Sequence, residues 1–248
     1  MSKKATAWVS RPNGTIAELT SEGPGEVIEC EASDLSVGAD GTVWVVTNQP
    51  IGAAEDETPG AVIQFKKAKS KKWETIPAQG ATRIEGGPKG AVAYIVDANG
   101  TVLTVDPKGK AEAISPTSFA REVSVGVDGT VWAISDDGVH GGAAVHFYDG
   151  KEWKRLPEDI TATKVGAADK GIAYLCNAFG QLSKVDTNGN EDYLSGEGFA
   201  REVSVDPNGN VWVITFDHDE DGGNKVICQM GGEGAWIDVE GGALRIDA

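Results

Sequence analysis

An internal repeat constrains this chain more than any other feature of its sequence. The run Phe-Ala-Arg-Glu-Val-Ser-Val occurs at residues 119–125 and again at 199–205, 80 positions apart. Each copy continues through an Asp-Gly or Asn-Gly turn to Trp132 or Trp212, and a third, more divergent copy ends at Trp44. Such turns between apolar runs are typical of β-hairpins. The chain is therefore predicted to consist of repeated antiparallel units.

A second kind of unit alternates with these tryptophan units. It begins near Ala81 and again near Thr161, and it has Tyr94 or Tyr174 in place of the signature tryptophan. We call these the plain units. Each unit of either kind has about 40 residues, the length of a four-stranded propeller blade.

The two ends of the chain complete one another. Residues 243–246 (Ala-Leu-Arg-Ile) match the first strands of the plain units at 81–84 and 162–165, and the N-terminal segment lacks such a strand. Joining the ends makes a sixth unit and removes an unpaired strand edge. We predict an all-β, six-bladed propeller in which residues 1–248 form a single domain. Three double-blade repeats make the ring, and the C-terminal strand closes it by pairing into the N-terminal blade. Five or seven blades are the alternatives.

Composition agrees with this fold and excludes some partners. The 33 glycines favour many tight turns, and the formal net charge of −16 repels nucleic acids and anionic membranes. We find no signal peptide and no stretch long enough to span a membrane, so no membrane insertion is expected. The chain is predicted to be soluble and cytoplasmic, with leaderless release as the alternative. The three cysteines suit buried, reduced thiols.

The tryptophan units resemble the tectonin β-propeller repeat of tectonin and the fish egg lectins. The resemblance rests on the motif Ser-Val-Gly-x-Asp-Gly-Thr-Val-Trp, which lies at the end of the runs 35–44 and 123–132. A strand such as residues 62–65 follows the motif, and the pattern Trp-x-x-Ile/Leu comes after that strand. Several family members are lectins with sites along blade boundaries. The resemblance therefore implies a carbohydrate-binding protein with up to three repeated shallow sites, whose partners are glycans or glycoconjugates.

Six tryptophans are the candidate ligand-binding residues. The outer strand of each tryptophan unit has a second tryptophan near charged residues, where an amphipathic ring can either stack on a sugar or pack against its blade. The residues before these outer tryptophans differ between units, which repeated sites would not favour. The outer rings are the main candidates and the signature rings support them: Trp73, Trp153 and Trp236, then Trp44, Trp132 and Trp212.

Acidic loops support the main alternative function. The segments between the second and third strands of the tryptophan units contain carboxylates at residues 55–57, 136–137 and 217–221. In a propeller these segments emerge on one face. That face is predicted to be acidic, so the alternative is a protein-interaction scaffold that docks a basic protein partner.

One acidic loop also resembles the start of a calcium-binding loop. Asp217, Asp219 and Asp221 alternate before Gly222, but the glutamate expected at the twelfth position is missing, so a solvated loop is the alternative to calcium binding. No nucleophile motif and no phosphate-binding loop occurs, and we predict that the protein is not an enzyme. A metal-dependent hydrolase is the third interpretation, from the fold alone.

Overall fold

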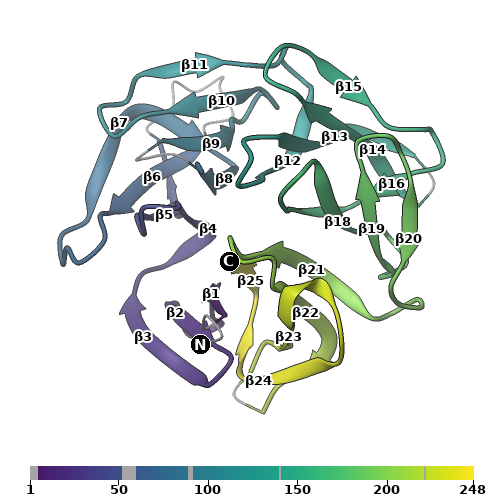
Figure 1. The fold of residues 1–248 in the computed structure, drawn as a ribbon. Helices are drawn as coiled ribbons and strands as arrows, with labels where there is room; N and C mark the ends of the chain where they lie inside the picture. The colour runs from purple at the N-terminus through teal and green to yellow at the C-terminus, as the bar shows by residue number, and fades with distance from the viewer. Residues whose placement is uncertain (1–4, 52–59, 89–91, 140, 221) are drawn as a thin grey trace.

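The computed structural model describes residues 5–51, 60–88, 92–139, 141–220 and 222–248, which form a six-bladed β-propeller (Figure 1). Six small antiparallel sheets surround a central axis, and each contains one repeat unit. In the described chain the helical content is a single 3₁₀ turn, Met230–Gly232. None of the described residues forms a helix with the length and apolar character needed to cross a membrane. The predicted fold class is confirmed.

The second, fourth and sixth blades correspond to the tryptophan units, and we call them the tryptophan blades. In each blade the strands are named in order from the axis outward. The second blade has β4 (Ala32–Val37), β5 (Val43–Pro50), β6 (Ala61–Lys66) and β7 (Glu74–Ala81). The fourth has β12 (Ala120–Val125), β13 (Val131–Val139), β14 (Gly142–Tyr148) and β15 (Trp153–Arg155), with β16 (Thr161–Ala162) also paired to β14. The sixth has β21 (Ala200–Val205), β22 (Val211–His218), β23 (Asn224–Gln229) and β24 (Trp236–Ala243).

The first, third and fifth blades are the plain blades. The third has β8 (Arg83–Gly86), β9 (Ala93–Val96), β10 (Val102–Val105) and β11 (Ala111–Ala113). The fifth has β17 (Lys164–Ala167), β18 (Ile172–Cys176), β19 (Leu182–Asp186) and β20 (Glu191–Tyr193). The first combines both ends of the chain in β25 (Arg245–Asp247), β1 (Thr6–Ser10), β2 (Thr15–Thr20) and β3 (Gly23–Glu29).

The first blade confirms the predicted closure of the ring. Strand β25 pairs antiparallel with β1 and places Ile246 opposite Val9. It also binds the second blade, because Asp247 Oδ2 accepts hydrogen bonds from the Val37 backbone N–H (2.7 Å) and from the Ser36 hydroxyl (2.9 Å). The C-terminal strand thus joins the first blade to the second, and β25 lies beside β1 in Figure 1.

The hydrophobic core lies between blades. In the fourth blade, Trp132 and Ile134 face the fifth blade, whereas Val131 and Ala133 face the third. Both faces of a sheet that is sandwiched between neighbours must be apolar, and both faces of this one are. The three signature tryptophans are 0% exposed, and each packs against the plain blade that follows it: Trp44, Trp132 and Trp212.

The hairpin turns of the tryptophan blades combine a glycine with an aspartate or asparagine. In the fourth blade Gly129 has a φ of 88°. The Asp128 carboxylate accepts a hydrogen bond from the Thr130 backbone N–H at 2.9 Å. The strand ladder ends where Val125 lies opposite Val131, so the turn is longer than two residues, and the aspartate stabilises it through its side chain.

In the fourth and sixth blades the segments predicted as long loops are largely paired among the described residues. Strands β13 and β14 continue beyond a register shift until Val139 lies opposite Gly142, and β22 and β23 do the same until His218 lies opposite Asn224. A bulge lets a hairpin continue with a changed direction. The two hairpins extend from the same end of their blades.

Substitution of a signature tryptophan should destabilise the ring strongly. We expect Trp132→Ala to lower the free energy of unfolding by about 3–5 kcal/mol, because a large buried side chain is replaced by a cavity. Equilibrium urea unfolding measures the change. Trp132→Phe is the control and should lose much less, since the indole Nε1 has no hydrogen-bond partner among the described residues. Wild-type stability in Trp132→Ala would contradict the packing role.

Candidate functional site

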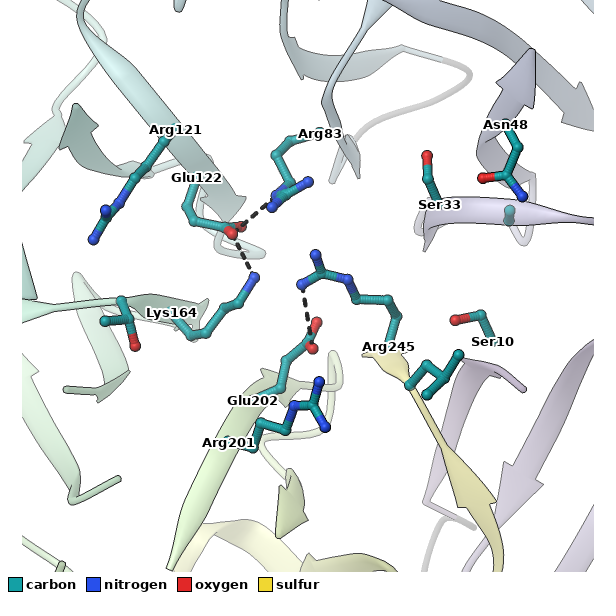
Figure 2. A pocket seen from close by; sticks show the side chains of 13 residues that line it. Ser10, Ser33, Asn48, Arg83, Arg121, Glu122, Lys164, Arg201, Glu202 and Arg245 are labelled. Atoms are coloured by element: carbon teal, nitrogen blue, oxygen red, sulfur yellow. Dashed lines mark hydrogen bonds and ion pairs between the residues drawn. The ribbon is translucent and has the colours of Figure 1, made fainter. Parts of the chain in front are cut away.

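A hollow of about 690 Å³ opens at the centre of the face that bears these hairpins (Figure 2). All six blades contribute to its lining, and we call it the funnel. Its walls are polar and charged. The charged lining residues are five cations, Arg83, Arg121, Lys164, Arg201 and Arg245, and two carboxylates, Glu122 and Glu202.

The repeat architecture places these charges. Each inner strand of a tryptophan blade supplies an acidic residue at the same position of its motif, and each inner strand of a plain blade supplies a basic one. Acid and base therefore alternate around the axis. In chain order they are Asp34, Arg83, Glu122, Lys164, Glu202 and Arg245, on β4, β8, β12, β17, β21 and β25.

The funnel carboxylates are held by their basic neighbours. Arg83 Nε donates to Glu122 Oε1 at 2.9 Å, and Lys164 Nζ donates to the same oxygen. Burial opposes ionisation of Glu122, but Lys164 and Arg83 together hold its pKa below the usual value. Arg245 Nη1 lies 3.4 Å from Glu202 Oε2, and burial, the larger influence, raises the Glu202 pKa.

A layer of buried carboxyl groups forms the floor beneath these charges. Burial raises the pKa of Asp34 to about 7 and that of Asp247 to about 6. The pKa of Glu85 also lies well above its usual value, because of burial and then of the neighbouring Asp247 carboxyl. The space at this level is only about 30 Å³, roughly enough for one water molecule. The funnel therefore narrows sharply toward its floor.

The structure changes the predicted character of this face. Exposed carboxylates lie on the surrounding hairpins, at Asp137, Asp217 and Glu220. The predicted acidic face therefore has a basic centre, where cations outnumber carboxylates. The acidic residues 55–57 lie outside the described residues.

The charged ring was not predicted from the sequence, and Arg83, Lys164 and Arg245 in particular were not singled out. The signal was present in the aligned strand starts at 81–84, 162–165 and 243–246, which share a basic third residue. Each basic residue lies in a different unit, and only the closed ring brings the three of them together.

The predicted tryptophans fall into two groups. Trp44, Trp132 and Trp212 are buried between blades, so assigning them as ligand contacts is wrong: a ring with no exposed surface cannot reach a ligand in a surface groove. The outer rings are half-buried and pack against the preceding blade. Trp153 is held most closely, because its Nε1 donates to the Ile114 carbonyl oxygen at 2.6 Å.

The outer rings also have aromatic neighbours. The centroid of Trp153 lies 4.7 Å from that of Phe119, and Trp236 lies 5.5 Å from Phe199. Among the described residues no phenylalanine ring makes the equivalent contact with Trp73, which packs against the cluster that contains Trp8. The three surroundings therefore differ, and sugar stacking on Trp73, Trp153 and Trp236 stays a prediction.

The predicted calcium site gains no support from the described residues. Asp217 lies near the end of β22, and Asp219 lies in the turn that follows, where its carbonyl oxygen accepts from the Gly222 N–H at 3.1 Å. Asp221 is outside the described residues. Among those that are described, no group of three or more His, Cys, Asp and Glu side chains is arranged to hold a metal ion.

Comparisons with known proteins show the fold and no family. No family model matches the chain, and no curated protein matches it, so membership of the tectonin family is not confirmed. Solved propellers do resemble it. YCF48 bound to D1 peptide is 18% identical with a TM-score of 0.55, covering 94% of this chain and 78% of that one. YCF48 from Cyanidioschyzon merolae is 17% identical with a TM-score of 0.54, covering 96% and 82%.

TolB from Acinetobacter baumannii has the higher TM-score of 0.70 at 15% identity, with 98% of this chain covered. The chain spans only 65% of the TolB chain. At these identities the similarity extends to the propeller fold alone.

The raised pKa of Asp34 predicts an unusual pH dependence of stability. The unfolded carboxyl has a pKa near 3.8 and the folded one about 7, so the folded state binds more protons between these values. The free energy of unfolding should therefore fall as the pH rises from 4 to 7, by up to about 1.4 kcal/mol per pH unit from this group. Asp34→Asn should reduce that slope.

Urea unfolding at pH 5, 6, 7 and 8 measures the slope. The exposed Asp238→Asn is the control and should retain the wild-type slope. The same slope in Asp34→Asn and in the wild type would show that Asp34 titrates alike in the folded and unfolded states.

Proposed function

We propose that this protein is a protein-interaction propeller that binds a peptide segment of its partner in the funnel. The observation behind this proposal is the hollow itself, which has about 690 Å³ and polar walls contributed by every blade. Ligand sites are typically concave and of this size, with polar groups that fix orientation. A peptide segment suits it because the funnel ends at a narrow floor and cannot admit a folded domain.

The structural neighbours support the same class of ligand. YCF48, which shares this fold, was solved with the D1 peptide bound. Binding is also favoured over catalysis by the local contacts, since Glu122 and Glu202 are both paired with cations and neither is free to act as a general base.

Carbohydrate binding at the outer tryptophans is the second candidate. A glycan array separates it from peptide binding, with the wild type tested beside Trp153→Ala. We expect no selective signal, because the Trp153 ring is already occupied by Phe119 and by the Ile114 carbonyl oxygen. A glycan that binds the wild type and is lost with Trp153→Ala, in protein that remains folded, would support the lectin function instead.

Selection of peptides on the immobilised protein tests the proposed function. Random 12-residue peptides displayed on phage should yield sequences that bind the wild type. Leu244 is 40% exposed and lines the funnel, so Leu244→Trp should narrow it and weaken these peptides at least tenfold. Val27→Trp is the matched control on outer strand β3, where the side chain is 53% exposed, and should bind normally.

Two outcomes would contradict the funnel as the binding site. One is the absence of any enriched peptide. The other is a set of peptides that bind Leu244→Trp and Val27→Trp equally well.

A further inference from the structure

The charge of the funnel is opposite to the charge of the molecule. The chain has 22 Lys and Arg residues against 38 Asp and Glu residues. Five cations and two carboxylates nevertheless line the funnel. Like charges gathered in a concave, partly desolvated site repel one another unless an opposite charge enters. This excess of positive charge indicates an anionic ligand.

Two of the cations have no carboxylate partner among the described residues. Arg201 Nη1 donates to the neutral Asn224 Oδ1 at 2.7 Å, and Arg121 Nη2 contacts the Ala162 carbonyl oxygen at 3.5 Å. Each guanidinium has five N–H donors, so most of them stay available at both sites. Arg83 and Lys164, in contrast, share Glu122. Arg121 and Arg201 are therefore the groups best placed to bind an incoming carboxylate.

The two arginines are equivalent by repeat. Arg121 follows the first residue of β12, and Arg201 follows the first residue of β21. Both line the funnel, and Figure 2 shows them on two different inner strands, with Arg245 paired to Glu202. The second blade has Ser33 at the corresponding position. Two of the three tryptophan blades therefore have an arginine at this position.

The hairpins around the funnel set a limit on the ligand. Their exposed carboxylates, such as Asp137, Asp217 and Glu220, would repel a long polyanion as it passes over the rim. Screening at physiological salt acts over about 8 Å, so each zone acts mainly on the ligand charges nearest to it. A ligand that satisfies both zones is acidic over a few residues and basic on either side.

We propose that the funnel recognises a short acidic segment of a partner protein, flanked by basic residues, whose carboxylates bind Arg121, Arg201 and Arg245. Guanidinium groups bind carboxylates with two parallel hydrogen bonds, which gives orientation as well as affinity. The flanking basic residues contact the acidic hairpins. This inference rests on the proposed function, and it names the chemistry of the segment that binds.

Fluorescence anisotropy with three synthetic peptides of equal length tests it. The first has four central glutamates with two lysines on each side, the second has the charges reversed, and the third is neutral. The first should bind the wild type at least tenfold more tightly than the other two. Its affinity should fall between 50 and 300 mM NaCl, because the contacts are ionic.

The double variant Arg121→Gln/Arg201→Gln should bind the first peptide at least tenfold more weakly. Loss of charge-assisted hydrogen bonds at one arginine is sufficient for that factor. The matched control is Lys71→Gln/Lys72→Gln, which changes the net charge equally at exposed positions before β7. It should keep the wild-type affinity. Thermal melts followed by circular dichroism establish that both variants are folded.

The outcomes separate this inference from the proposed function. Equal affinity for the first two peptides, or an equal loss in both double variants, would overturn the acidic-segment proposal. If the phage selection still yields funnel-dependent peptides without acidic residues, only this inference fails. If the selection yields none, the proposed function fails with it.

Discussion

Closure of the ring by β25 is the contact on which the rest of the structure depends. Without it, β1 would be an unpaired edge and the first blade would leave the second uncovered. The contact belongs to a wider set of hydrogen bonds around the axis, in which a serine of each tryptophan blade accepts a backbone N–H from a plain blade. The donors are Gly86, Ala167 and Ala248, and the acceptors are Ser36, Ser124 and Ser204.

Packing between blades decides what the tryptophans can do. A sheet covered on both faces needs large apolar side chains on both, and the signature rings fill that need toward the following blade. The outer rings face the preceding blade and are only half-buried. The tryptophans occupy fixed positions in every tryptophan unit, and packing at the blade boundaries explains those positions. Packing therefore accounts for the tryptophans at the boundaries, whereas the proposed peptide site lies at the axis.

The axis gathers charge because the inner strands are short, equivalent and close together. Three acidic and three basic residues alternate there. Lys164 and Arg83 hold the pKa of Glu122 below its usual value despite its burial. At Asp34 and Glu202 burial outweighs the nearby cations and raises the pKa. The result is a basic funnel above a floor of carboxyl groups whose pKa values are raised by burial.

The sequence by itself determined the number of blades, their alternation and the closure, since these follow from local repeats and from the match between residues 243–246 and 81–84. It did not reveal the funnel, because Arg83, Lys164 and Arg245 lie about 80 positions apart and become neighbours only when the ring closes. Burial of Trp132 was likewise decided by the neighbouring blade, which no single unit contains. Local pattern sets strands and turns, whereas the sign of a site's charge depends on which strands meet.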